Sequence, residues 1–380
     1  MTVSRQKHRP SCMLYFADSV FSACVVAPLV VGYWRGLWHL QDHYRVSAWC
    51  AFVGGISIHC VLCLARSWLE VHAGYTMWHP LAVRVYSILY STACISHWRG
   101  GWAIIDSYPH SFTLITALSG VCLLASRTVR NVIAPPCVIL LDTPQQAYSF
   151  PTAFRKSSRD TWLYVLDCVF SVTVVGSLVV FVWRGSWTLL DIYIYPNHHD
   201  WSAWASLAIG YSIIILIFSI QKPMKILCAR LKGIPRLIVA DTYLLASFAG
   251  TCNLWRGIWN LLNVYFLHDL PLVSYWASHI VCLLLLMLLN CSNSVLVRGV
   301  YIDGEEEGGK CVVFPIYYLR LFFQTRRLQK LEKIHEEQQK QQQQQTKKRG
   351  ASISSADAVP PPGTNHLVLA PLMDAPETVV

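Results

Sequence analysis

Long apolar stretches constrain this chain more than any other feature of its sequence. Eight of them are about 20 residues long, the length that a helix needs to cross roughly 30 Å of hydrocarbon. They lie at about 14–34, 47–66, 79–98, 111–130, 161–183, 201–221, 237–255 and 273–296. Only 14% of the 380 residues are charged, against about 25% in a soluble domain. We therefore expect an integral membrane protein and exclude a disordered chain, a secreted disulfide scaffold and an ordinary cytosolic enzyme.

Positive charge alternates between the connections that join these stretches. Lysine and arginine are frequent before residue 14 and in 127–160 and 221–236, and Arg66 and Arg84 bracket 66–84. The intervening connections contain no lysine, and their arginines are Arg35, Arg45, Arg99, Arg184 and Arg256. Because cytoplasmic loops of membrane proteins carry the excess of lysine and arginine, this pattern predicts that both termini are cytoplasmic and that the number of spans is even. The same placement accounts for the net charge of +10 without a nucleic-acid partner.

One motif, W-R-G-x-W-x-[LI]-x-[DN]-x-Y, occurs four times, each time at the end of an odd-numbered stretch. Its residues are Trp34, Arg35, Gly36, Trp38, Asp42 and Tyr44, then Trp98, Arg99, Gly100, Trp102, Asp106 and Tyr108, then Trp183, Arg184, Gly185, Trp187, Asp191 and Tyr193, and finally Trp255, Arg256, Gly257, Trp259, Asn263 and Tyr265. Repetition at this spacing indicates a duplicated structural unit. Two spans belong to each copy, so the copies have the same orientation in the membrane.

A second repetition relates the two halves of the chain. Ser47-Ala48-Trp49 matches Ser202-Ala203-Trp204, and a segment around Asp142 matches one around Asp303. The predicted fold is therefore all-α: a polytopic bundle of eight transmembrane helices in four parallel hairpin repeats. We expect the segments 1–13 (cytoplasmic N-terminus), 14–155 and 156–315 (membrane halves), 316–345 (basic, glutamine-rich) and 346–380 (disordered tail).

The motif has two interpretations. If it is helical, Trp34, Trp38 and Asp42 share one face of the helix, because they are four residues apart. In the structural interpretation the tryptophans fix helix depth, Gly36 permits close approach, and each Arg bridges to the Asp of its own or a neighbouring copy. In the functional interpretation the four Arg form an outer ring that attracts anions or an acidic partner. Asn263 interrupts the Asp pattern, so if one of the four arginines is free for a ligand, we expect it to be Arg256.

Four ionisable residues lie near the inner ends of odd-numbered spans: Asp18, Arg84, Asp167 and Asp241. Such groups are costly in a membrane unless they are paired or hydrated. We favour interfacial capping or an ion pair between Arg84 and one of these aspartates; a proton or cation relay is the alternative. No metal, cofactor or catalytic residue is expected, since the spans lack G-x-S-x-G, H-E-x-x-H and metal-spaced sets.

The chain from residue 316 changes character. Apolar and basic residues recur there at helical spacing, which is typical of an amphipathic helix that lies on anionic inner-leaflet lipid. The chain then reads Glu377-Thr378-Val379-Val380. Thr378 and a terminal Val380 with its carboxylate fit strand addition to a PDZ groove, so a cytoplasmic PDZ scaffold is an expected partner.

The eight stretches, the four W-R-G-x-W motifs and the duplicated Asp142 and Asp303 segments resemble the fuseless family of invertebrate membrane proteins, over about residues 12–320. The resemblance implies a presynaptic, multi-pass protein of the plasma membrane that supports calcium-channel localisation and evoked vesicle release. It implies a calcium channel or its complex as a partner, and it offers no catalytic residues to carry over. The first hypothesis is therefore a non-enzymatic membrane organiser. The alternative is a transporter or channel for a small solute, anionic if the four arginines line its path.

Overall fold

The computed structural model describes residues 12–73, 79–108, 111–142, 148–159, 161–297, 299–321 and a few positions between 323 and 342. The chain divides into a larger unit, 16–316, and a smaller one that combines 1–15 with 317–380. In the smaller unit the guanidinium of Arg320 lies over the rings of Tyr317 and Tyr15, 4.0 and 5.4 Å from their centroids. The larger unit carries the features described below.

The larger unit is built from helices and irregular loops, and its described residues contain no β-strand. Four rods carry the repeated motif: α1 (Cys12–Phe21) continued through the π-helical η1 (Ser22–Val26) into α2 (Ala27–His43); α4 (His79–Asp106); α7 (Thr161–Val169) continued through the π-helical η3 (Phe170–Val175) into α8 (Gly176–Tyr193); and α10 (Gly233–Tyr265). Four further helices are α3 (Ala48–Ala73), α5 (Phe112–Ala125), α9 (His199–Arg230) and α11 (Pro271–Leu288). The 3₁₀ turns η2 (Val129–Val132), η4 (Ser292–Val295) and η5 (Lys310–Val312) lie in the loops.

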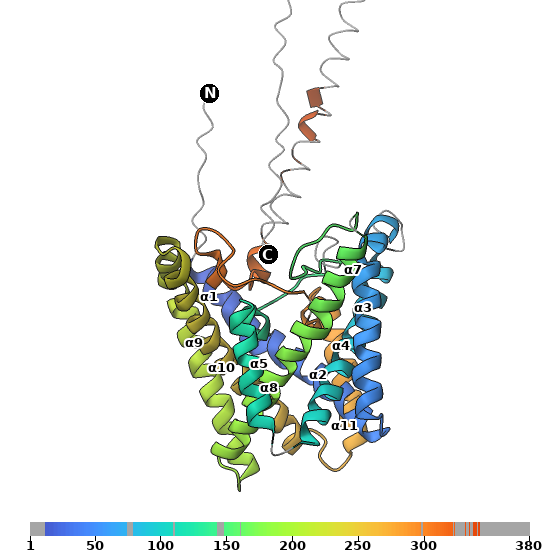
Figure 1. Cartoon of the computed structure of the whole chain (residues 1–380). Helices are drawn as coiled ribbons and strands as arrows, with labels where there is room; N and C mark the ends of the chain where they lie inside the picture. Colours follow the sequence, from blue (N-terminus) through green and yellow to red (C-terminus); the bar gives the residue numbers. More distant parts are fainter. Residues whose placement is uncertain are drawn as a thin grey trace, which may run out of the picture. The chain divides into compact units, whose positions relative to one another are not determined.

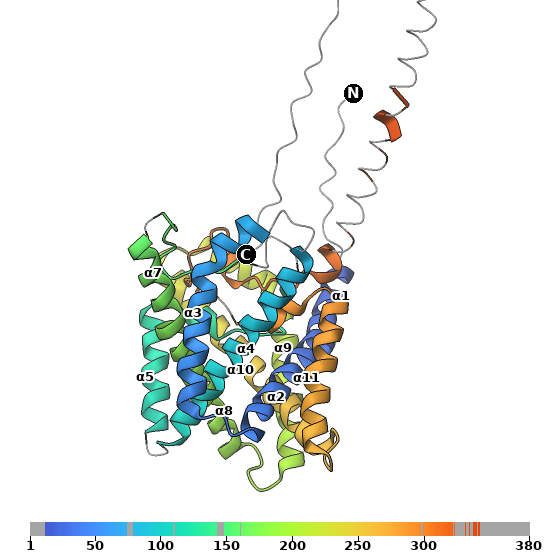
Figure 2. The ribbon, with the colours of Figure 1, turned by 90° about the vertical axis from the view of Figure 1, so that its right-hand side faces the viewer.

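The helices form two concentric sets (Figures 1 and 2). The motif-bearing helices α2, α4, α8 and α10 contact one another in a closed cycle and surround a central axis. Each outer helix packs mainly on the inner rod that follows it in the chain, so α3 packs on α4, α5 on α8 and α9 on α10, while α11 packs back on α2. Helices that a motif joins in the chain, such as α2 and α3, are therefore not the packed pairs, and the ring closes between α11 and α2.

Six helical segments among the described residues are long and apolar enough to span a membrane: Met13–His43, Ala48–Leu69, Thr161–Tyr193, His199–Arg230, Gly233–Tyr265 and Pro271–Leu288. The chain is thus a multi-pass membrane protein. The helices at the other two predicted stretches differ from these. α4 has 28 residues but is not among these segments, and α5 has only 14 residues, about 21 Å at the rise of an α-helix.

α5 and α11 end earlier than the apolar stretches predict. In α5 the N–H of Arg127 donates to the carbonyl of Leu124 and that of Thr128 to Leu123, while Arg127 has a φ of +56°. Asn290, with a φ of +54°, ends α11 in the same way. This pattern is a Schellman cap, which satisfies the last carbonyls and turns the chain. The residues beyond each cap, which include Val129, Val132 and Val295, belong to loops.

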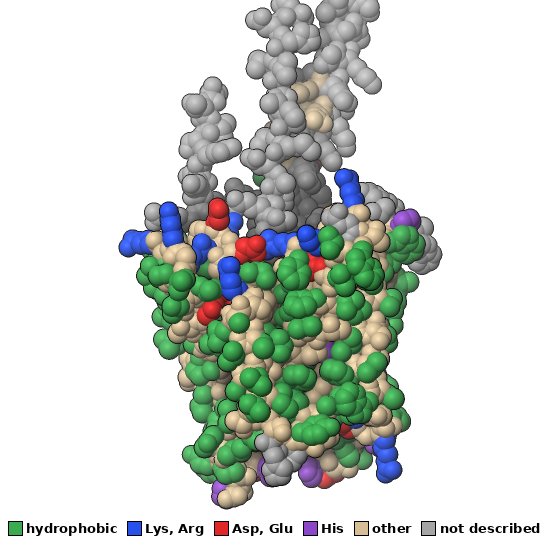
Figure 3. Space-filling view, in the orientation of Figure 1, with side chains coloured by type: hydrophobic (Ala, Val, Ile, Leu, Met, Phe, Trp, Pro, Cys, Tyr) green, Lys and Arg blue, Asp and Glu red, His purple; other side chains and the backbone are tan. Residues whose placement is uncertain are grey.

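Most exposed lysine and arginine side chains of the larger unit gather at one end, above a broad apolar band, although Arg45 is exposed at the opposite end (Figure 3). We call this the basic end; it carries Arg127, Arg155, Lys156, Arg159, Lys222, Lys225, Arg230 and Lys232, all exposed. The opposite end, where the four motifs finish, is called the motif end. The charge asymmetry that the sequence predicts between alternate connections is thus present in the folded unit.

Two loops enter the bundle from the basic end and make equivalent contacts with each other. The first loop follows α5 and the second follows α11. The N–H of Ile139 donates to the carbonyl of Pro315 (3.0 Å), and the N–H of Val300 donates to that of Pro151 (2.7 Å). Asp142 of the first loop accepts the N–H groups of Ser292 and Asn293 at 3.1 and 2.8 Å. The exchange is reciprocal, so the segments whose sequences match also match in structure.

Asp303 of the second loop supplies the other half of this exchange. Its carboxylate accepts the N–H groups of Val129 and Arg130 at the start of η2, at 2.6 and 2.8 Å. We expect Asp303→Ala to lower the free energy of unfolding by about 2 kcal/mol, because it leaves two N–H groups without an acceptor where water is excluded. Glu307→Ala, at an exposed position of the same loop, should leave the thermal midpoint of the purified protein unchanged. Equal midpoints for the two variants would contradict the capping role.

Candidate functional site

The eight motif tryptophans form two stacked rings around the central axis. In the first ring the centroids of Trp34, Trp98, Trp183 and Trp255 follow one another at 5.3, 5.7, 5.5 and 5.6 Å. In the second ring those of Trp38, Trp102, Trp187 and Trp259 follow at 5.4, 5.5, 6.0 and 5.7 Å. Neighbouring planes meet at 66–85° in the first ring and at 79–89° in the second. Edge-to-face contact at these distances is the preferred geometry of aromatic pairs.

The first ring rests on the two loops that enter from the basic end. Trp34 donates its indole N–H to the carbonyl of Val295, Trp183 to that of Val132 and Trp255 to that of Pro135, at 2.9, 3.0 and 2.7 Å. Irregular backbone at membrane depth is stable only where protein covers it or where it lines a cavity. Val132 and Val295 are 1% exposed, so the loops cover this side of the first ring, where a cavity of only about 30 Å³ remains beside Trp98.

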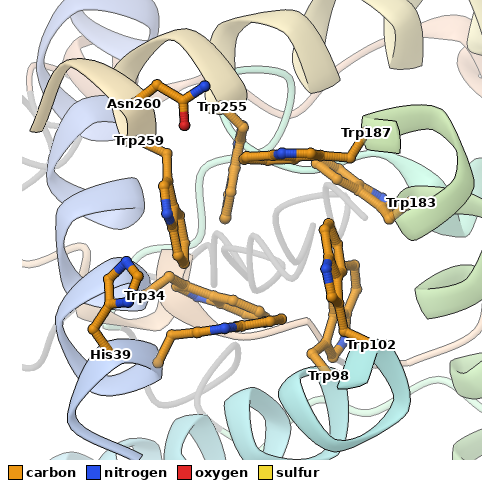
Figure 4. Close-up of a pocket in the computed structure, with 10 residues that line it drawn as sticks. Trp34, His39, Trp98, Trp102, Trp183, Trp187, Trp255, Trp259 and Asn260 are labelled. Atoms are coloured by element: carbon orange, nitrogen blue, oxygen red, sulfur yellow. The ribbon is translucent and has the colours of Figure 1, made fainter. Parts of the chain in front are cut away.

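A cavity of about 160 Å³ lies within the tryptophan rings (Figure 4). All eight tryptophans line it, together with His39 and Asn260, which follow the second-ring tryptophans of α2 and α10. The equivalent positions on α4 and α8 are Ala103 and Thr188, so the cavity departs from fourfold symmetry at the contact between α2 and α10. We call this cavity the vestibule.

The motif arginines bind the acidic positions of the preceding repeat in a closed cycle. The Nε of Arg99 donates to Asp42, that of Arg184 to Asp106, that of Arg256 to Asp191 and that of Arg35 to Asn263, at 2.6–2.7 Å. The arginine side chains in the three ion pairs are 3–18% exposed and their aspartates 43–47%. The cycle ties each inner rod to its neighbour, as the structural interpretation of the motif predicts for neighbouring copies.

The expectation that Arg256 is free for a ligand is wrong. Arg256 binds Asp191 and also donates to Ser202 and Ser206 of α9. Because each arginine reaches back by one repeat, Asn263 faces Arg35 instead. Arg35 is 2% exposed and donates to the hydroxyls of Ser274 and Ser278 at 3.1 and 3.4 Å. The cycle thus holds four arginines against three aspartates, and the positive charge in excess lies at Arg35.

Exchanging Asp and Asn as the acceptor of a motif arginine should change the free energy of unfolding in opposite directions at Asn263 and Asp191. We expect Asn263→Asp to raise the free energy of unfolding by about 1 kcal/mol, because a hydrogen bond between charged groups replaces one to a neutral amide. Asp191→Asn makes the reverse change opposite Arg256 and should lower it by a similar amount. Thermal unfolding of the purified protein measures both. Shifts of the same sign would show that acceptor charge does not govern these contacts.

The motif glycines lie at close contacts between the inner rods and the outer helices. A Cβ on Gly36 would come within 2.6 Å of the carbonyl oxygen of Tyr275, and one on Gly100 within 2.3 Å of the backbone nitrogen of Phe52. Gly257 meets the backbone of α9 at Leu207 in the same way, whereas Gly185 meets the side chain of Thr116 on α5. All four glycines are helical, so the residue permits close helix packing and does not break the helix.

Of the predicted inner charges, Asp167 caps a loop and Arg84 forms an ion pair. Asp167 accepts the hydroxyl of Thr152 at 2.7 Å and the N–H groups of Phe154 and Lys156 at 3.0 and 2.9 Å, so it caps a loop as expected. Arg84 pairs with Asp142 at 3.1 Å, not with one of the three aspartates proposed for it. The predicted partner of Arg84 was wrong because the loop that carries Asp142 folds back into the bundle.

Asp18 and Asp241 are both buried, at 0% and 7% exposure. They lie on α1 and α10, in rods that carry the motif. The motif tyrosines Tyr44, Tyr108, Tyr193 and Tyr265 are 56–78% exposed at the motif end, which suits the interface between membrane and water. Thr378 and Val380 of the tail lie outside the described residues.

The sequence patterns did not predict two groups of site residues. The loop carbonyls of Val132, Pro135 and Val295 have no sequence signature, because every residue has a backbone carbonyl. The serines that bind Arg256 and Arg35 left a trace. Ser202 belongs to the Ser-Ala-Trp match between the halves, and both Ser202–Ser206 and Ser274–Ser278 have the four-residue spacing of one helix face.

Comparison with known proteins places the chain in a family. The model of the Fuseless family matches residues 13–296. This range includes all four motifs and the six described helical segments that are long and apolar enough to span a membrane. No curated protein and no solved structure matches the chain. Residues beyond 296 lie outside the match. The protein belongs to the Fuseless family.

Proposed function

We propose that this protein is a non-enzymatic organiser in the presynaptic plasma membrane, which supports calcium-channel localisation and evoked vesicle release. In this proposal the eight helices all span the membrane as four parallel hairpin repeats, with both termini cytoplasmic. The observation that carries it is the packing around the axis: two loops cover one side of the first tryptophan ring, and each motif arginine is held by side chains of a neighbouring repeat. Such packing suits a rigid platform. The synaptic role rests on family membership.

The topology is tested by labelling intact cells with an impermeant thiol reagent. Tyr193→Cys lies at the motif end, and Ser157→Cys at the basic end, both at exposed positions. We expect the first to be labelled on intact cells and the second only after permeabilisation. The native cysteines give the background in the unsubstituted protein. Labelling of Ser157→Cys without permeabilisation would overturn the proposed orientation.

The organiser role is tested by rescue of neurons that lack the protein. The full chain should restore calcium-channel density at active zones and evoked release. The segment Glu377–Val380 is the proposed contact with a cytoplasmic PDZ scaffold, where the final side chain enters an apolar pocket. Val380→Asp should therefore reduce channel density, while Val379→Asp, whose side chain alternates to the other face of an extended strand, should not. Failure of the full chain to restore channel density would refute the organiser.

The vestibule favours a second candidate, a transporter or channel. The cavity of about 160 Å³ lies on the pseudo-symmetry axis, where repeat proteins of the membrane hold their substrates. Its lining contains no arginine, so the anion path through an arginine ring loses its basis. Solute uptake by proteoliposomes that contain the protein would favour transport. Rescue of channel localisation by the full chain, with no uptake, would favour the organiser.

A further inference from the structure

The second tryptophan ring has the form of a box. Viewed along the axis, the indoles of Trp259, Trp187 and Trp102 are seen nearly edge-on along three sides of a square, so that ring faces line the space between them (Figure 4). Trp38 completes the cycle, and neighbouring planes meet at 79–89°. The rings therefore stand as four walls, and their faces carry the negative side of the aromatic quadrupole.

The dimensions of this box match those of a cation site. With centroids 5.4–6.0 Å apart around a square, the centre of the box lies about 4 Å from all four centroids, inside the range of roughly 6 Å over which an aromatic face attracts a cation. Tryptophan gives the strongest attraction of the aromatic residues. A charge at the centre would therefore face four indoles at once.

Beyond the box, the carboxylates are the more exposed partners of the three motif ion pairs. Asp42, Asp106 and Asp191 follow the second-ring tryptophans by four residues on their helices, so they lie one turn further along the same face. Their side chains are 43–47% exposed, whereas the arginines that they bind are 3–18% exposed. A solute that approaches the vestibule thus meets carboxylates, because the matching guanidinium groups are covered by protein.

The size and the polar lining limit the ligand further. A cavity of about 160 Å³ is close to the volume, about 150 Å³, that holds one benzene molecule in an engineered protein cavity. Asn260 lines the space and offers an amide oxygen to an N–H donor. We infer that the vestibule binds a compact organic ammonium ion, with its nitrogen between the indole faces and its short apolar part along the tryptophans.

Binding is tested on the full chain purified in lipid nanodiscs. The probe is propylammonium chloride, followed by tryptophan fluorescence and by the thermal midpoint, with sodium chloride added to equal ionic strength in the controls. We expect a saturable fluorescence change and a higher midpoint. 1-Propanol has a similar shape without the charge, and propanoate carries the opposite charge; both should give at least tenfold weaker effects. A response to 1-propanol equal to that of propylammonium would overturn the inference, as would stronger binding of propanoate or no response to any probe.

Variants locate the site. Trp102→Leu keeps an apolar side chain but removes one aromatic wall. It should weaken propylammonium binding about tenfold, which corresponds to 1.4 kcal/mol of binding free energy. Trp102→Phe keeps an aromatic face and should retain most of the affinity. The matched control is Trp204→Leu, since Trp204 lies on α9 outside the vestibule and is 54% exposed. Equal weakening by Trp102→Leu and Trp204→Leu would place the ligand elsewhere. Ammonium binding does not depend on the synaptic role, so the two proposals fail separately.

Discussion

Gly100→Leu is expected to destabilise the protein by about 3 kcal/mol or more. Gly100 of α4 faces the backbone of α3, where an added Cβ would lie 2.3 Å from the nitrogen of Phe52. Backbone atoms cannot rotate away as a side chain does, so the two helices must separate along their contact, at a cost at the upper end of the usual range for overpacking. The measurement is the thermal midpoint of the purified protein, with yield of folded protein as a second readout.

Gly120→Leu is the matched control for this change. Gly120 is also helical, on α5, and an added Cβ there would meet nothing within 4 Å. Leucine is a better helix former than glycine by up to about 1 kcal/mol, so Gly120→Leu should leave the midpoint unchanged or raise it. If the two variants melted together, close packing at the motif glycine would not be the reason for its place in the motif.

Trp34→Ala is expected to destabilise the protein strongly. Trp34 is 2% exposed, contacts Trp98 and Trp255 edge to face, and donates to the carbonyl of Val295. Its removal opens a cavity and leaves a buried carbonyl without its donor. We expect a loss of about 4 kcal/mol, within the range for tryptophan to alanine in a core.

The comparison for Trp34→Ala is a tryptophan outside the rings. Trp201→Ala on α9 removes the same number of atoms from a side chain that is 68% exposed, so its cost should stay below about 1 kcal/mol. Thermal unfolding of both variants gives the difference. Near-ultraviolet circular dichroism reports the coupling between ring tryptophans and should collapse only for Trp34→Ala. Retention of that signal would mean that the ring does not depend on each of its members.

The repeated motif predicted much of the site, because spacing within one helix is fixed by helix geometry. Trp34, Trp38 and Asp42 had to share a face, and the four copies had to be equivalent. Spacing does not tell in which direction a side chain reaches, however. Each arginine binds the preceding repeat, and an error of one repeat was enough to assign the unmatched position to Arg256 when it belongs to Arg35.

Hydropathy predicted the helices but not their ends or their partners. The apolar residues after Ala125 and Leu288 are buried against the bundle as loops, and a hydropathy window does not distinguish burial in protein from burial in lipid. Arg84 illustrates the same limit. Its partner Asp142 is 58 residues away on a loop, and only the tertiary fold brings that loop beside α4.

The closure of the ring between α11 and α2 has a consequence for biosynthesis. α2 is made first, yet the helix that covers Gly36 is the last of the outer set to leave the ribosome. Until then one flank of the first rod has to be shielded by lipid or by an insertion chaperone. A nascent chain arrested before residue 271 should consequently remain sensitive to a crosslinker placed on that flank, and completion of the last hairpin should abolish the crosslink.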